Sequence, residues 1–348
     1  MGGDLKGTLS QKLVLSSESV SSAPITESPG PAAKAKKSSE MTGSTRIWAV
    51  GGGKGGTGKS FVAANLGLLL AEKALSINLV DADLGTPNLH TFLGIQDPVP
   101  NLGDFLYRRD LTLNQVAIAT PESSLRLVSG PTRTLFGNNL KYFQKRKLLN
   151  HIRRLDGAIT LVDIGAGTDF NDLDFFLMSD VGIVVATPDP ASVENAYHFL
   201  RSAAYRTLEA TARKLGIEVL LDRIVKARHS GPISIPELLE ELSKLDKGSA
   251  QVLAGALQLR ENFLIMNQTH NHSPESVGPS ICNVSRKVLG IPLRFLGAIP
   301  WDETSRLSLK RFNPHVRSFP GSKATQALRR ITDHLVSSQV QTDNGNQI

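Results

Sequence analysis

A glycine-rich loop near residue 55 carries the most specific chemistry in this sequence. Residues 53–60 read GKGGTGKS, which fits the pattern G-x-x-x-x-G-K-[ST] of a phosphate-binding loop. Glycines let backbone N–H groups converge on phosphate oxygens, and a following helix adds the partial positive charge of its N-terminus. We expect Lys59 to reach the β and γ phosphates and the Ser60 hydroxyl to bind Mg²⁺. The pattern predicts a nucleoside triphosphate site with a magnesium ion.

A second lysine, Lys54, lies near the start of this loop, although the phosphates of one subunit need only Lys59. Residues 54–60, KGGTGKS, resemble the deviant Walker A loop KGGxGK[ST] of the MinD/ParA class of P-loop ATPases. In that class the first lysine reaches the nucleotide of the partner subunit and stabilises developing charge there, much as an arginine finger does. The resemblance implies hydrolysis of ATP to ADP and phosphate, a catalytic Lys54, and a homodimer that forms with ATP.

The same resemblance assigns nucleotide contacts along the loop and at one distant residue. These residues are Gly53, Lys54, Gly55, Gly56, Thr57, Gly58, Lys59, Ser60 and Phe61, together with Asn267. In the family an asparagine at the corresponding strand end recognises the base, so adenine is the implied base. An asparagine after a strand is also a common turn residue.

Three aspartates extend the resemblance to the switch segments. Residues 77–95, INLVDADLGTPNLHTFLGI, resemble the second strand and switch I, so Asp83 is implied to orient the attacking water and Asp81 to lie closer to Mg²⁺. Residues 159–167, ITLVDIGAG, resemble the Walker B strand and switch II. Asp163 is implied to hold Mg²⁺ through water. Ser60, Asp81 and Asp163 are thus the implied metal-binding set.

One position in switch II departs from the family pattern. Gly165 stands where the family often has proline, and the resulting sequence DIGAG is similar to the branch that regulates flagellar number and placement, the FlhG/FleN type. The glycines of this segment allow the backbone to move when the γ-phosphate leaves. The resemblance therefore points to this branch within the class.

The elements that position these residues alternate between strand and helix. The predicted strands are the β-rich runs RIWAV, SINLVDA, LRLVSG, AITLVDIG, VGIVVAT, NFLIMNQ and LRFLGAI, with helical patterns between them. Such alternation predicts parallel pairing. We expect an α/β P-loop NTPase fold with a mostly parallel sheet of about seven strands and helices on both faces.

Composition divides the chain into three parts. Residues 1–44 are rich in Ser, Pro, Ala and Lys and have no sustained apolar periodicity, which predicts a disordered N-terminal arm. Residues 45–336 are expected to form the ATPase domain, with a helical insertion at about 203–258, and residues 337–348 a polar C-terminal tail. Within the insertion, Ser234 begins a capping-box pattern, S-x-x-E.

Charge and cysteine content bear on partners and compartment. The net charge is +7, and residues 141–154, KYFQKRKLLNHIRR, predict an amphipathic helix. Either this helix only packs on the sheet with its basic face outward, or that basic face makes weak contact with DNA or an anionic membrane. No apolar run approaches the roughly 18–20 residues of a membrane span, no secretory signal is recognisable, and the lone Cys282 agrees with a reducing compartment. We expect a cytoplasmic protein, with the inner membrane face as a peripheral location and an unidentified protein as partner.

The expected function is a molecular switch in spatial organisation, with flagellar number and placement as the first interpretation. The alternative is an ATP-dependent DNA- or nucleoid-binding partition protein of the ParA type, which the positive charge favours. Iron–sulfur carriers and nitrogenase reductases share the loop but need paired cysteines, and this chain has one cysteine. Metabolic ligases and synthases of the same fold stay open.

Overall fold

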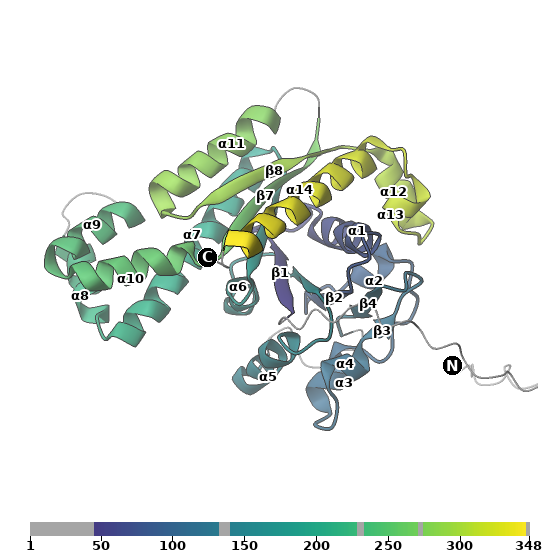
Figure 1. The fold of residues 1–348 in the computed structure, drawn as a ribbon, viewed down its shortest axis with the longest axis horizontal. Coiled ribbons are helices and arrows are strands. Elements are labelled where there is room, and N and C mark those ends of the chain that lie inside the picture. The colour runs from purple at the N-terminus through teal and green to yellow at the C-terminus, as the bar shows by residue number, and fades with distance from the viewer. Residues whose placement is uncertain (1–44, 132–139, 228–232, 271–273, 346–348) are drawn as a thin grey trace, which may run out of the picture. The chain divides into compact units, whose positions relative to one another are not determined.

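An eight-stranded sheet in the order β3-β4-β2-β5-β1-β6-β7-β8 forms the centre of the described chain (Figure 1). Its neighbouring strands are parallel, except that β3 pairs antiparallel with β4. The strands are β1 (Arg46–Gly51), β2 (Ile77–Ala82), β3 (Ile118–Ala119), β4 (Leu125–Val128), β5 (Ile159–Ile164), β6 (Val181–Ala186), β7 (Glu261–Thr269) and β8 (Leu293–Pro300). The predicted α/β fold is confirmed, and all of the predicted strands are present.

This is a computed structural model, and it describes residues 45–131, 140–227, 233–270 and 274–345. The arm predicted for residues 1–44 lies outside the described residues. The helices are α1 (Lys59–Ala71), α2 (Leu89–Phe92), α3 (Leu102–Tyr107), α4 (Leu113–Val116), α5 (Tyr142–Ile152), α6 (Phe170–Leu177), α7 (Pro190–Leu215), α8 (Glu218–Ala227), α9 (Ile235–Leu245), α10 (Lys247–Gln258), α11 (Pro274–Val284), α12 (Glu303–Lys310), α13 (His315–Ser318) and α14 (Lys323–Gly345), with a π-helical turn η1 (Ser285–Leu289) after α11.

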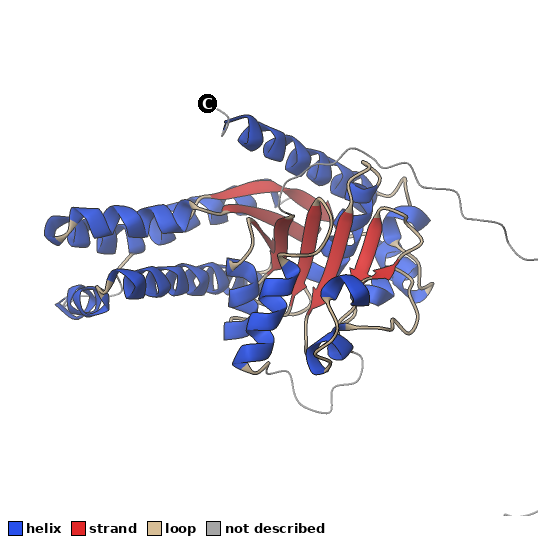
Figure 2. Ribbon diagram, turned by 60° about the horizontal axis from the view of Figure 1, so that its bottom comes forward, coloured by secondary structure: helices blue, strands red, loops and turns tan. Residues whose placement is uncertain are grey.

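Helices cover both faces of the sheet, as Figure 2 shows. Successive side chains of a strand point to opposite faces, so Ile47 and Ala49 join one buried cluster while Trp48 and Val50 join the other. The first cluster is completed mainly by α5, α6, α7 and α9 to α11, and the second by α1, α2 and α14. Because both faces are covered, β2, β5 and β6 are buried at every residue rather than at alternate ones.

Helix α1 is buried on nearly all sides. Every residue from Phe61 to Ala71 is buried, and α1 packs against β1, β2, β5 and α14. Gly67 lets α1 lie close to β2, since a Cβ atom on Gly67 would be only 2.9 Å from the side chain of Leu79. The start of α1, which follows the glycine-rich loop, is therefore fixed by the core.

The predicted insertion is helical. Helix α7 ends at Gly216, which has a left-handed φ of 70°, and both α8 and α10 pack against α7 and against α9 (Figure 1). At the start of α9 the Ser234 hydroxyl accepts from the Glu237 amide, and the Glu237 carboxylate accepts from the Ser234 amide. The last helix, α14, continues to Gly345, past the boundary that we expected at residue 336.

Candidate nucleotide site

The glycine-rich loop joins the end of β1 to the start of α1, the setting that a phosphate loop requires. Gly58 has φ 88° and immediately precedes α1. A Cβ atom on Gly58 would lie 2.2 Å from the amide nitrogen of Asn267, so both backbone conformation and space require glycine. Gly55 and Gly56 are exposed at the tip of the loop, whereas Gly53 lies against the backbone of α7.

Lys59 points back into its own loop. Its Nζ donates to the backbone oxygen of Lys54 at 3.2 Å, and the residue is only 7% exposed. Burial lowers the pKa of Lys59, while the charges of Asp163, Asp83 and Asp172 act in the opposite direction. A buried ammonium group that bonds only a carbonyl is well suited to receive phosphate oxygens.

Asp163 is the orphaned acid of the site. It is 1% exposed, and neither of its carboxylate oxygens has a hydrogen-bond partner. Burial raises the pKa of Asp163 to about 7, and the neighbouring Ser60 hydroxyl and the Lys59 charge oppose that rise. Two buried acceptor oxygens beside a hydroxyl fit a magnesium ion bound by Ser60 and held by Asp163 through water, because Mg²⁺ keeps several water ligands.

Asp81 lies beside Asp163 on the neighbouring parallel strand, where the two residues are in register. Asp81 is fully buried, and its two oxygens accept from the backbone amides of Asp83 (3.2 Å) and Leu89 (3.0 Å). Burial and then the charge of Asp163 raise the pKa of Asp81 well above its usual range. In this conformation Asp81 fixes the segment that follows β2, and the metal-facing role implied for it remains a proposal.

Asp83 organises a turn at the mouth of the site. Its Oδ1 accepts from the amides of Gly85 (3.1 Å) and Thr86 (3.0 Å), and its Oδ2 accepts from the Thr86 hydroxyl at 3.1 Å. Asp83 is half-buried, and its charge acts on both Lys59 and Asp163. It therefore lies at the phosphate end of the loop, where a water-orienting residue belongs.

Lys54 is exposed and turned away from the buried side of the loop. Its Nζ lies 3.6 Å from Oδ1 of Asp189, and the two side chains are 45% and 47% exposed. Asp189 is the N-cap of α7, because its Oδ1 accepts from the Ser192 amide at 2.9 Å. The sequence reasoning missed Asp189, although an aspartate before a proline and a helical pattern is a recognisable N-cap signal.

A cavity of about 250 Å³ opens beside the loop, between the ends of β7 and β8. Asn267 and Phe61 line it, together with Phe92, Trp301 and Arg306. The Asn267 amide donates to the backbone oxygen of Thr57 at 2.8 Å, so it braces the loop from the cavity wall. The hydroxyl of Thr57 is buried without a partner. The sequence reasoning missed Trp301, which is 44% exposed and stacks on the ring of His270, with centroids 5.6 Å apart. An aromatic ring in the wall of the cavity is also suited to stack on a base.

Asp172, on the first turn of α6, was also missed. Its charge acts on Lys59, and it lies against Gly165 of switch II, where a Cβ atom would be 2.9 Å from its Oδ1. The available signal was an acidic residue in the first turn of the helix after switch II. The predicted residues Lys59, Asp83 and Asp163 and the unpredicted Asp172 therefore meet at one end of the phosphate loop.

The described side chains of the site offer too few metal ligands to hold a magnesium ion without a phosphate ligand. Among the described residues no three His, Cys, Asp or Glu side chains gather into a metal site, so a magnesium ion here depends on phosphate oxygens and water as well. In the part of the chain that the structure describes, no helix combines the length and apolar character needed to cross a bilayer.

Comparisons with known proteins agree with this geometry. Residues 48–314 match the family described as the CobQ/CobB/MinD/ParA nucleotide binding domain. The antiactivator FleN of Pseudomonas aeruginosa is 25% identical over 299 residues, which cover 84% of this chain and 86% of FleN. The flagellum site-determining protein YlxH of Helicobacter pylori is 31% identical over 160 residues, which cover 44% of this chain and 52% of YlxH.

A solved structure supports the fold. The septum site-determining protein MinD from Pyrococcus horikoshii, complexed with Mg-ADP, aligns with a TM-score of 0.55 and 22% identity, covering 84% of this chain and 96% of MinD. At that identity the likeness shows the fold alone. The family match covers most of the chain and includes the loop, both switch segments and Asn267. The chain therefore belongs to the CobQ/CobB/MinD/ParA family of nucleotide-binding P-loop proteins.

Proposed function

We propose that this protein is a magnesium-dependent ATPase that converts ATP and water to ADP and phosphate. The observation that carries the proposal is the pair of unsatisfied groups at the loop: a buried Lys59 that bonds only a carbonyl, and a buried Asp163 with two orphaned oxygens. Lys59 and the loop amides hold the phosphates, and the Asn267 side of the cavity receives adenine. Ser60, together with Asp163 through water, would hold a magnesium ion, which would supply neutralisation of the charge on the β and γ phosphates.

The protein's own residues position the reactants. Asp83 orients the attacking water, and its three hydrogen bonds to the following turn fix its carboxylate. Catalysis of phosphoryl transfer depends mainly on such positioning and on stabilisation of charge. Asp81 holds the backbone of switch I through the Asp83 and Leu89 amides, which keeps that carboxylate in place.

Lys54 completes the site of a second subunit. It is too exposed to serve the buried phosphates of its own loop, and its nearest anionic partner is the surface residue Asp189. An exposed ion pair of this kind contributes only about 0–1 kcal/mol, so Lys54 can leave Asp189 at little cost. ATP then brings two subunits together, and hydrolysis separates them.

This ATP-dependent switch acts in spatial organisation, and we propose flagellar number and placement as its setting. The support is the similarity to FleN, which extends over most of both chains, and to YlxH over part of each. An unidentified protein partner reads the dimer. Septum-site and putative plasmid partition proteins share the fold, so the fold alone does not select the setting.

Size-exclusion chromatography with light scattering tests the switch. The wild type should be monomeric with ADP and dimeric with ATP and Mg²⁺, and Asp83→Ala should accumulate as the dimer because it holds ATP without orienting water. A wild type that stays monomeric with ATP, while calorimetry shows that ATP is bound, would contradict the dimeric mechanism. Asp156→Asn, a surface change, serves as the matched control.

A ParA-type contact with DNA is the second candidate, and the basic helix α5 favours it. Arg146 and Arg154 are exposed, but Lys145 pairs with Asp174 at 2.5 Å and Lys147 lies 4.0 Å over the Phe105 ring. Fewer basic side chains of α5 are therefore available to bind DNA than the sequence suggested. An ATP-dependent, salt-sensitive mobility shift of DNA that Arg146→Glu abolishes would support this candidate.

A further inference from the structure

The carboxylate of Asp172 lies where switch II meets the phosphate loop. A Cβ atom built on Gly165 would be 2.9 Å from Asp172 Oδ1 and 3.5 Å from both Cγ and Oδ2 of the same residue, so its three nearest atoms all belong to this carboxylate group. Gly165 directly follows β5, which carries the metal-facing Asp163. The absence of a side chain at residue 165 therefore makes room for this carboxylate, and a proline or alanine there would displace it.

The charge of Asp172 is felt inside the nucleotide site. It acts on Lys59, and the Asp83 charge acts on it in turn. Burial first, and then the charges of Asp169 and Asp83, raise the pKa of Asp172 to about 6. The Asp172 charge therefore acts on the same lysine that is proposed to bind the β and γ phosphates.

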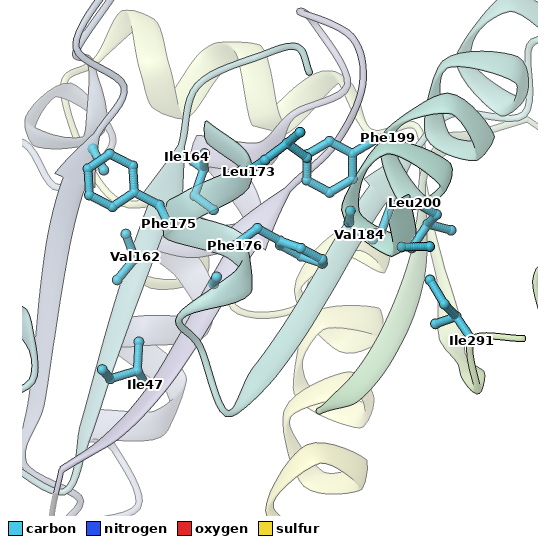
Figure 3. Close-up of a cluster of buried hydrophobic side chains, with 14 of the residues drawn as sticks. Ile47, Val162, Ile164, Leu173, Phe175, Phe176, Val184, Phe199, Leu200 and Ile291 are labelled. Carbon is cyan, nitrogen blue, oxygen red and sulfur yellow. The ribbon is translucent and has the colours of Figure 1, made fainter. Parts of the chain in front are cut away.

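Helix α6 ties Asp172 to the core beneath the site. Leu173, Phe175 and Phe176 of α6 are buried, and the Phe176 ring meets the Phe199 ring of α7 edge-on, with centroids 4.8 Å apart (Figure 3). Asp172 therefore cannot move far from Gly165 by local rearrangement of a loop, because the residue after it is packed in the core. Its displacement requires a new side-chain rotamer or a shift of the start of α6.

We propose that Asp172 discriminates against the triphosphate, because its carboxylate occupies the side of the site that a γ-phosphate enters and must be displaced before ATP is held. The inference rests on the proposed ATPase function and adds a residue to it. A γ-phosphate carries negative charge toward Lys59, Asp83 and Gly165, where Asp172 already stands. ADP ends at the β-phosphate and meets less of this repulsion. Asp172 is thus a specificity-determining residue that couples the arrival of the γ-phosphate to movement of switch II.

Calorimetry on the full chain with Mg²⁺ tests this, using ADP and the slowly hydrolysed analogue AMPPNP. Asp172→Asn keeps the shape and removes the charge, so the preference for AMPPNP over ADP should rise about tenfold, an ordinary size for a coupling between two groups. The matched control is Asp156→Asn, which removes the same charge at an exposed position before the start of β5, at the edge of the sheet opposite to the site. Water screens that charge, so its effect should stay below about twofold.

A second variant, Gly165→Ala, tests the same carboxylate by displacing it rather than by removing its charge. In the otherwise wild-type chain, Gly165→Ala should displace the Asp172 carboxylate and raise the preference for AMPPNP over ADP. Combined with Asp172→Asn, it should raise that preference no further. Thermal melts show that each variant is folded. An unchanged preference in folded Asp172→Asn, or an equal change in Asp156→Asn, would overturn the inference while leaving the ATPase proposal intact. A folded wild type that binds neither nucleotide would contradict the proposed function, and the inference with it.

Discussion

Lys59 and Lys54 are the same residue type in opposite surroundings. Lys59 is 7% exposed and faces three carboxylates, whereas the Lys54 side chain is 45% exposed and pairs with Asp189 on the surface. Burial strengthens the attraction of Lys59 for phosphate, because few water molecules compete there. The loop thus holds one cation for its own nucleotide and presents another outward.

Replacement of Lys59 tests the inward cation. Lys59→Ala should weaken ATP binding by about 100-fold or more, because the phosphates lose their charge-assisted contact inside a buried cradle. Isothermal titration calorimetry measures the affinity. Lys73→Ala, which removes a lysine just beyond the same helix and breaks a 2.6 Å ion pair with Asp333, should leave it unchanged. Equal ATP affinity in Lys59→Ala and the wild type would contradict the loop assignment.

The buried, unpaired carboxyl group of Asp163 should make the stability of the nucleotide-free protein depend on pH. Its pKa is raised to about 7 from the usual 3.8, so the folded chain keeps a proton that the unfolded chain has released. Stability without nucleotide therefore falls as pH rises through the interval from about 4 to about 7. Asp163→Asn should remove this contribution and raise the free energy of unfolding by roughly 1–3 kcal/mol at pH 8, since one pKa unit is about 1.4 kcal/mol.

Urea unfolding between pH 5 and 8, without magnesium or nucleotide, checks that expectation. Asp163→Asn should be the more stable protein at pH 8 and differ least from the wild type at pH 5, while losing magnesium-dependent ATP binding. Asp156→Asn, at an exposed position, should follow the wild type throughout. A lower free energy of unfolding for Asp163→Asn than for the wild type at pH 8 would contradict this expectation, because the Asp163 carboxylate would then stabilise the nucleotide-free protein.

At the level of elements, each part of the site comes from the carboxyl end of a strand. The loop follows β1, Asp83 follows β2, Asp163 is near the end of β5, and Asp189 follows β6. Ligands of open α/β sheets bind at such edges, because the loops there converge. Helix α1 starts at this edge as well, and its burial keeps the loop amides in a fixed direction.

Helix α7 begins at this edge with an N-cap that also holds Lys54. Asp189→Asn should keep the cap on the Ser192 amide and change the free energy of unfolding by less than about 0.5 kcal/mol, whereas Asp189→Ala should lower it by about 1 kcal/mol. Chemical denaturation separates the two. A loss in Asp189→Asn as large as that in Asp189→Ala would show that the charge, and not the cap, stabilises the start of α7.

The elements also show why prediction succeeded in some places. Buried β-rich runs such as residues 159–164 have no other stable environment than a covered sheet, so the strands could be identified. The antiparallel strand β3 was missed because two residues, Ile118 and Ala119, carry no periodic pattern and pair only through their neighbour. Lys59 followed from the spacing of the phosphate-loop pattern, and Lys54 from the resemblance to the deviant Walker A loop. Asp172 and Trp301 did not, since their roles depend on tertiary contacts with Gly165 and the cavity.

At the scale of the whole molecule, the proposed function implies that one subunit alone has an incomplete catalytic site. Its buried groups can bind ATP and Mg²⁺, but its Lys54 points outward to the surface. Two subunits that face each other across their nucleotide edges would each supply the missing cation, which makes hydrolysis depend on assembly. In the proposed function, such a dimer would report its nucleotide state to a partner protein.

Mixing two inactive variants tests this central claim most directly. Lys54→Ala subunits combined with Asp83→Ala subunits form a hybrid dimer in which the site of the Lys54→Ala subunit has its own Asp83 and a Lys54 from its neighbour. We predict that ATPase activity, absent from each variant alone, appears on mixing and reaches at most about half the wild-type rate per dimer, since one of two sites is restored. Subunits with different affinity tags allow co-purification to show that the hybrid forms. A hybrid dimer that forms with ATP and remains inactive would contradict the account, because Lys54 would then act within its own subunit.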